Sequence, residues 1–121
     1  MKYRLMDILA CPMCRNFPLK LLVFERESRY KVDNTVKCEL YCSYHVGAVS
    51  ELGETRCAEC YSYEIINGLI TCPKCGRWYA IIDEIPIMLP DYLRDRSRDE
   101  EFIAKWGKNI PPEILEKISL S

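Results

Sequence analysis

The fold of this chain is decided by the stretch C-P-K-C-G-R at residues 72–77, which repeats the form of C-P-M-C-R at residues 11–15. A C-x-x-C turn directs two thiolates toward one point, and two such turns supply the four sulfur ligands that structural zinc prefers. The proline fixes φ after the first cysteine, and Gly76 can adopt the positive φ that closes a knuckle behind the second. The matched motifs therefore predict a zinc ribbon whose ligands are Cys11, Cys14, Cys72 and Cys75.

Four more cysteines lie between these motifs, again as two close pairs: Cys38 and Cys42, then Cys57 and Cys60. Eight thiols make two tetrahedral sites, so the inner four predict a second zinc ion inside an inserted segment. A sequential arrangement, in which Cys38 and Cys42 join Cys11 and Cys14 on one ion and the other four cysteines bind a second, stays open on spacing alone. His45 could replace one inner sulfur, but the four thiols make this unnecessary and we expect it at the surface.

Length and charge set limits on the class of protein. The chain has 121 residues, the usual length of one domain, and 17 Lys and Arg against 18 Asp and Glu. The net charge of −1 lacks the positive field expected of a protein that binds nucleic acid alone. Neither a secretory signal nor a membrane-spanning run is apparent, so we expect a cytoplasmic protein whose thiols stay reduced.

The sequence also lacks the motifs of common catalytic sites. It has one histidine, no glycine-rich phosphate loop and no G-x-S-x-G nucleophile elbow. A catalytic metal keeps an open coordination position, whereas four thiolates fill the shell. A redox role for the C-x-x-C pairs would require a βαβ context that is not visible. We therefore expect a protein that is not an enzyme.

Short strands and turns predict a small β-sheet. Residues 20–25 predict a strand, because Leu21 to Phe24 form a short apolar run with a β-branched and an aromatic member. A hairpin is expected over residues 30–40, around Asp33-Asn34. Asn67-Gly68 is a strong turn signal and predicts a second hairpin within residues 64–71. Residues 78–89 predict two strands joined at Asp83-Glu84, the second lying at a sheet edge because it contains Pro86.

The end of the chain predicts two short helices. Residues 94–101 form a charged run typical of a solvated helical face, and Phe102, Ile103 and Trp106 follow on one stripe. A second helix is expected from residue 112 to residue 118. The fold class is therefore α+β: a zinc-ribbon-like domain of residues 1–20 and 64–90, an insert of residues 21–63 with the second cysteine cluster, and a helical tail of residues 91–121.

Three stretches, residues 4–14, 69–79 and 83–90, resemble the small zinc-binding activator subunits of S-adenosylmethionine-dependent methyltransferases that modify tRNA, ribosomal RNA and release factors. The insert, with its cysteines, fits an archaeal-type member. The family's usual Asp-Gly-Ile-Pro turn is replaced here by D-E-I-P at residues 83–86, which loses the positive φ that glycine adopts easily.

The resemblance implies a heterodimer in which the activator does no chemistry and pairs a strand with the sheet edge of the catalytic subunit. The partner-binding residues that it implies are apolar: Leu5, Met6, Ile8, Ile85, Pro86, Ile87, Met88 and Leu89. tRNA would be contacted only indirectly, through the partner. The alternative function is a nucleic-acid-binding zinc ribbon, whose binding would weaken steeply with salt.

Overall fold

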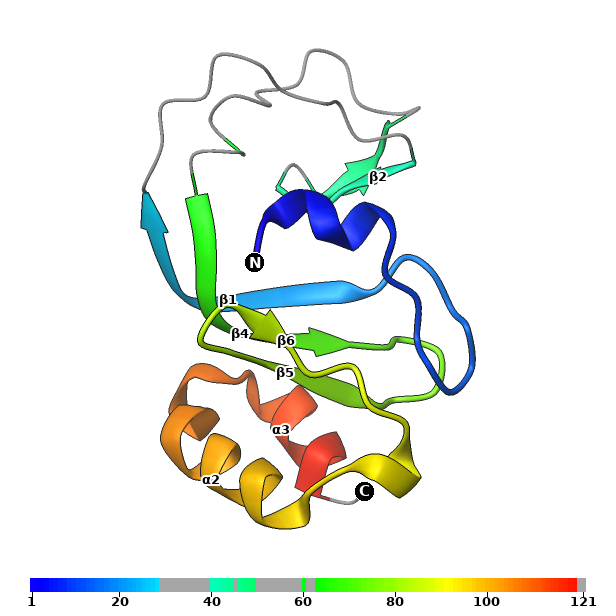
Figure 1. Ribbon diagram of the computed structural model, residues 1–121. Helices are drawn as coiled ribbons and strands as arrows, with labels where there is room; N and C mark the ends of the chain where they lie inside the picture. Colours follow the sequence, from blue (N-terminus) through cyan, green and yellow to red (C-terminus); the bar gives the residue numbers. More distant parts are fainter. Residues whose placement is uncertain (29–39, 45, 50–59, 61–62, 120–121) are drawn as a thin grey trace.

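The computed structural model has three layers, with a four-stranded sheet in the middle (Figure 1). It describes residues 1–28, 40–44, 46–49, 60 and 63–119. Within these ranges the elements are, in chain order, η1 (Tyr3–Asp7), β1 (Lys20–Ser28), β2 (Tyr41–Cys42), β3 (Gly47–Ala48), β4 (Tyr63–Thr71), β5 (Trp78–Ile82), β6 (Ile85–Pro86), η3 (Asp91–Leu93), α2 (Arg96–Trp106), η4 (Gly107–Asn109) and α3 (Pro112–Ser119). This confirms the predicted α+β class, a small sheet with a short helical tail.

The sheet has the order β1-β4-β5-β6, and every neighbouring pair is antiparallel. Successive residues of β5 face opposite sides, as the period of a strand requires. Tyr79 and Ile81 belong to a cluster with Met6, on the side of η1, whereas Trp78 and Ala80 belong to a cluster on the side of the tail. Both faces of β4 and β5 are therefore buried.

The predicted hairpin at Asn67-Gly68 is wrong, because both residues lie inside the continuous strand β4. Asn67 is 7% exposed, and its side-chain amide donates to the Glu25 carboxylate at 3.2 Å. Gly68 faces a close neighbour, since a Cβ atom there would lie 2.6 Å from the Leu22 carbonyl oxygen. The register of β1 against β4 shifts beside Asn67, so the pair marks an irregularity in the ladder, not a turn.

The predicted strand over residues 20–25 is confirmed, and it is longer than expected. β1 pairs with β4 from Lys20 to Ser28, so residues 21–28, which the expected domain division assigned to the insert, are part of the sheet. The predicted hairpin over residues 30–40 lies almost wholly outside the described residues.

The turn between β5 and β6 confirms the expected pair of short strands. Asp83 and Glu84 both adopt positive φ, at 48° and 72°, the backbone of a two-residue turn that glycine would normally supply. Ile82 pairs with Ile85, and Pro86 pairs with Ile81. β6 therefore ends the sheet, at the edge predicted from Pro86.

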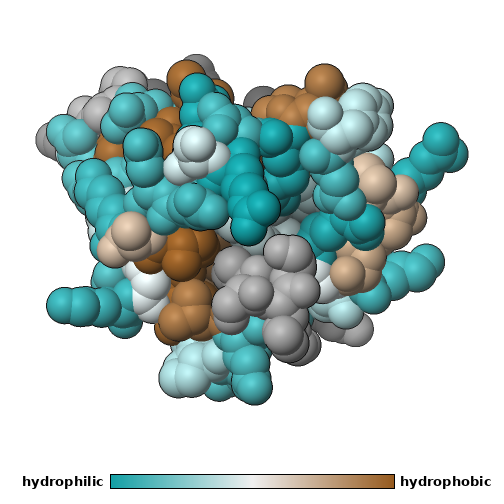
Figure 2. Space-filling view, turned by 90° about the horizontal axis from the view of Figure 1, so that it is seen from below, coloured by the Kyte–Doolittle hydropathy of each residue, from teal (hydrophilic) through white to brown (hydrophobic). Residues whose placement is uncertain are grey.

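The tail covers the face of the sheet opposite η1. α2 is capped by Asp95, the residue before it, whose carboxylate accepts hydrogen bonds from the Ser97 and Arg98 amides. This arrangement satisfies free N–H groups of the first turn. Phe102 is buried, with its ring 5.9 Å from that of Trp78. The solvent side of this layer is mainly hydrophilic, with a small apolar patch (Figure 2). Among the described residues, no helix has the length and apolarity needed to cross a bilayer.

The η1 layer is fastened to the short hairpin β2–β3 by buried polar contacts. The Asp7 carboxylate accepts hydrogen bonds from the amides of Leu40 and Tyr41, both at 2.8 Å. The Ser43 hydroxyl donates to the carbonyl of Tyr3 at 2.7 Å. The described part of the insert is thus held on η1.

Candidate metal centre

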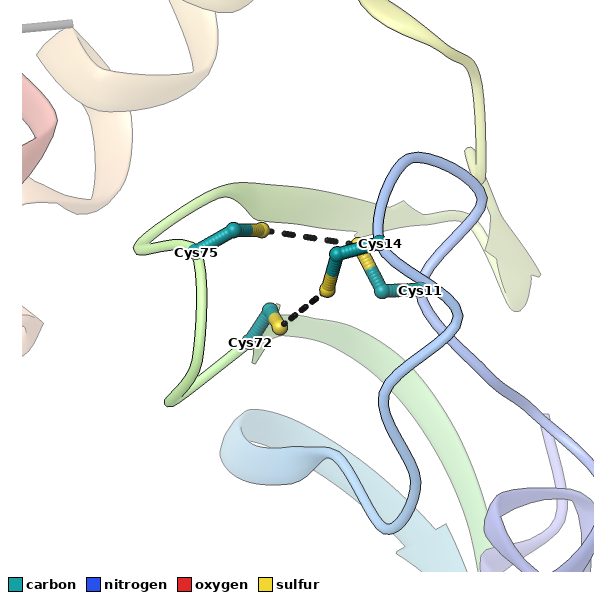
Figure 3. A group of neighbouring side chains, drawn as sticks. All are labelled: Cys11, Cys14, Cys72 and Cys75. Carbon is teal, nitrogen blue, oxygen red and sulfur yellow. Dashed lines mark hydrogen bonds between the residues drawn. The ribbon is translucent and has the colours of Figure 1, made fainter.

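Two loops bring four thiols together at one end of the sheet. Cys11 and Cys14 lie in the loop that follows η1, and Cys72 and Cys75 lie in the connection from β4 to β5 (Figure 3). The Cys11 and Cys75 sulfurs are 3.6 Å apart, and the Cys14 and Cys72 sulfurs are 3.4 Å apart. All four sulfurs lie within 4.8 Å of one another. The first-with-last grouping expected from the repeated motif is therefore the one that the structure brings together.

The two knuckles have the same backbone hydrogen bonds. In the first, the Arg15 amide donates to the Cys11 carbonyl at 2.8 Å; in the second, the Gly76 amide donates to the Cys72 carbonyl at 3.0 Å. Arg15 and Gly76 both have positive φ, at 63° and 75°. The Cys72 amide in turn donates to the Arg77 carbonyl at 2.8 Å. Each turn is thus closed by its own backbone, and each requires a left-handed residue behind its second cysteine.

The geometry and chemistry of the donors fit a zinc ion. A tetrahedral ion with Zn–S bonds of about 2.3 Å separates its sulfurs by about 3.8 Å, close to the distances in this cluster. All four donors are soft sulfur atoms, and Cys11 and Cys72 are almost completely buried, at 1% and 2% exposed. Four sulfurs complete a tetrahedral shell, which is the pattern of a structural site. The cluster could therefore bind one zinc ion.

The surroundings of the thiols shift their pKa values in opposite directions. Burial raises the pKa of the Cys11 thiol, but the Tyr79 hydroxyl and the turn amides favour the thiolate more strongly and lower the pKa to about 6. At Cys14 the Asn16 amide favours the thiolate, yet burial and the neighbouring sulfurs outweigh it and raise the pKa to about 12. A bound cation would stabilise the thiolate form of every member of the cluster.

Two residues outside the predicted ligand set contact the sulfurs. The Tyr79 hydroxyl lies 3.1 Å from the Cys11 sulfur and is fully buried. Burial and the nearby thiol raise the pKa of Tyr79, so it remains a hydroxyl that can donate. Burial raises the pKa of Cys75, but the Arg77 amide and guanidinium lower it overall. The cysteine spacing does not predict either contact. Tyr79 is 68 positions from Cys11 and reaches it only in the folded chain.

The second cysteine cluster stays a prediction. Cys38 and Cys57, and the side chain of Cys42, lie outside the described residues. Cys60 is described and is buried, at 4% exposed, in the apolar cluster on the η1 side. Within the described ranges, the group that could hold a metal is Cys11, Cys14, Cys72 and Cys75.

The residues expected to bind a partner differ in exposure. Ile8 is 67% exposed and Ile85 is 61% exposed. Met6, in contrast, is fully buried in the core, so it does not offer a contact surface here. The other members of the expected set are half-buried, namely Leu5, Pro86, Ile87, Met88 and Leu89.

Comparison with known proteins agrees with the geometry of the cysteines. The sequence model of one family, described as Trm112p-like protein, matches residues 2–84, which include all four cysteines of the metal centre. No match was found among curated proteins. The matched range is more than half of the chain and ends just before β6. The chain therefore belongs to the Trm112p-like family, whose members are non-catalytic activator subunits of methyltransferases.

Proposed function

We propose that this chain is a non-catalytic subunit that stabilises and activates S-adenosylmethionine-dependent methyltransferases acting on tRNA and other components of translation. It forms a heterodimer with the catalytic subunit, and it meets tRNA only through that partner. One zinc ion bound by Cys11, Cys14, Cys72 and Cys75 maintains the ribbon. The four free thiols suit a reducing compartment, such as the cytoplasm.

The observation that carries this proposal is the character of the β6 edge. An open strand edge exposes N–H and C=O groups that another strand can pair with. Native proteins protect such edges with charges, and the opposite edge of the sheet fits this rule, since the exposed end of β1 carries Glu25, Arg26 and Glu27. The β6 edge is apolar instead, and Ile85 is 61% exposed. An apolar open edge favours docking to a partner strand.

The backbone of this edge limits how a partner strand can pair. The Ile87 amide donates inward to the Ala80 carbonyl at 2.8 Å. Because the hydrogen-bonding groups of successive residues alternate in direction, those of Pro86 and Met88 point outward. Pro86 has no N–H, so the edge offers the Met88 amide as donor and two carbonyls as acceptors. A partner strand must match this short, acceptor-rich pattern.

Side chains next to the edge supply the apolar contact. Ile87 and Leu89 line a small cavity together with Ile82 and with Arg98 of α2. Met88 points to the other side of the sheet, where it packs against the η1-side core. Ile85 is thus the residue of this segment that can be changed with the least effect on the fold.

The test is co-expression with candidate methyltransferases, followed by co-purification and by methyl transfer from labelled S-adenosylmethionine to tRNA, ribosomal RNA and release factors. Ile85→Asp should reduce complex formation and activity at least about tenfold, because it places a charge in an apolar interface. Val46→Asp is the matched control, since Val46 is 76% exposed on the β2–β3 hairpin and away from the sheet edge.

Two outcomes would oppose the proposal. If Ile85→Asp and Val46→Asp bind and activate equally well, the β6 edge is not the docking surface. If the wild-type chain binds no methyltransferase but binds RNA with an affinity that falls steeply with salt, the nucleic-acid-binding alternative holds.

A further inference from the structure

Arg77 occupies the junction between the second knuckle and the sheet. Its carbonyl accepts the Cys72 amide at 2.8 Å, which closes the turn around the cysteines. It follows Gly76, which has φ 75°, and precedes Trp78, the first residue of β5. The backbone position of Arg77 is therefore set by closure of the knuckle.

The side chain of Arg77 reaches from this junction to the start of the tail. Its Nε lies 3.0 Å from both carboxylate oxygens of Asp91, and its Nη2 lies 2.8 Å from Oδ2. Asp91 is the first residue of η3. A planar guanidinium that holds a carboxylate through two nitrogens fixes orientation as well as distance. The entry of the tail is thus fastened to the residue that closes the knuckle.

Arg94 makes a second tie between the same two regions. Its guanidinium donates to the Trp78 carbonyl, lies 4.5 Å from the centre of the Trp78 ring, and pairs with Asp99 of α2 at 3.0 Å. A groove of about 860 Å³ separates the knuckle from the apolar residues of α2 and α3. Arg77 and Arg94 both line this groove, and each connects the region around the start of β5 to the tail.

We propose that Arg77 is a positioning residue through which metal binding at the four-cysteine site and docking of the tail strengthen each other. With metal bound, the knuckle is closed and the Arg77 guanidinium is placed to hold Asp91. With Asp91 held, the knuckle is restrained from opening, so metal leaves more slowly. Coupling between two equilibria is reciprocal, so metal affinity and docking of the tail must favour each other by the same factor. The Asp91 carboxylate and, after it, the Cys75 thiol raise the pKa of Arg77.

This inference rests on the zinc site and is independent of the methyltransferase partner. The test uses the full chain loaded with one zinc ion, and it measures zinc release to an excess of a colorimetric chelator. Asp91→Asn removes the ion pair and leaves Arg77 and the cysteines intact. We expect zinc to be released about two- to fivefold faster, because this is the size of effect that the loss of one well-oriented, partly exposed ion pair produces. Arg77→Gln should give a similar change, and the double variant little more, because both remove the same ion pair.

Two controls separate this effect from others. Arg96→Gln breaks the i,i+4 pair with Glu100 in the same helix, where Arg96 is 93% exposed, and should leave the release rate unchanged. Val23→Ala removes packing from β1, on the other side of the sheet, and shows how much release speeds up for a given loss of stability. Asp91→Asn should release zinc faster than Val23→Ala does for the same loss of stability. Hydrogen exchange of the backbone amides at residues 91–99 should also become faster.

The inference is overturned if zinc-loaded Asp91→Asn releases metal at the wild-type rate, or no faster than Val23→Ala at the same loss of stability. It is also overturned if the effects of Arg77→Gln and Asp91→Asn simply add. A chain that retains no zinc at all would instead contradict the metal site itself, so the two failures can be told apart.

Discussion

Exchanging the residues behind the two knuckles tests whether backbone conformation limits the stability of the metal centre. Arg15 and Gly76 occupy equivalent positions, with φ of 63° and 75°. Arg15 is exposed, so its removal sacrifices little packing. A Cβ atom added to Gly76 would meet nothing within 4 Å. Both substitutions therefore act mainly through the conformational preference of the backbone.

The expected magnitude follows from two opposing effects. A residue with a Cβ atom in the left-handed region costs about 1–2 kcal/mol, whereas glycine loses about 0.5–1 kcal/mol more on folding because its unfolded chain is freer. Arg15→Gly should therefore raise the free energy of unfolding by about 0.5–1 kcal/mol, and Gly76→Ala should lower it by a similar amount. The double variant Arg15→Gly/Gly76→Ala should unfold close to the wild type.

The measurement is urea unfolding followed by tryptophan fluorescence at a fixed, buffered concentration of free zinc. Zinc must be held constant because binding to the native state adds to the apparent stability. Equal dependence on urea concentration in all variants would show that the denatured states are alike. The reasoning is refuted if Arg15→Gly is destabilised by about 1 kcal/mol, or if the double variant is no more stable than Gly76→Ala.

Three further results are expected. Glu84→Gly should raise the free energy of unfolding by about 0.5–1 kcal/mol, since Glu84 has φ 72°; an unchanged urea midpoint would contradict this. Gly68→Ala should lower it by about 1–3 kcal/mol, because the new Cβ atom would lie 2.6 Å from the Leu22 carbonyl oxygen; wild-type stability would mean that the strands can move apart freely. Zinc affinity should rise at least about tenfold per pH unit near neutrality, because the Cys14 thiol, with its pKa raised to about 12, must release a proton on binding. The rise should be steeper below about pH 6, where the Cys11 thiol is protonated too, and an affinity that does not change with pH in a chelator competition would oppose this.

The metal centre could be predicted from the sequence because its signal is local. The C-P-x-C form dictates the backbone of each knuckle, and the repetition of that form at residues 11–15 and 72–77 identifies which pairs belong together. The turn at Asp83-Glu84 and the edge position of Pro86 were predictable for the same reason. Each depends on the conformational limits of a few consecutive residues.

The error at Asn67-Gly68 shows where local signals end. The same two residues suit a tight turn or an irregular strand, and only the neighbours decide between them. Here Glu25 accepts the Asn67 amide, and the Leu22 carbonyl approaches Gly68 too closely for a Cβ atom. Neither neighbour is near in sequence. The contact of Tyr79 with Cys11, across 68 positions, was invisible for the same reason.

The position of the metal centre explains how one small ion can organise the whole sheet edge. Cys14 and Cys72 are 58 positions apart, and an ion bound by the folded chain would add its binding free energy to the stability of the fold that brings them together. The insert lies between these two cysteines, so its length alters the entropic cost of bringing them together only weakly, through a logarithm. β6 lies outside this stretch and is held by β5, which begins three residues after Cys75. Zinc bound at the knuckles would therefore fix the strand that positions the proposed docking edge at β6.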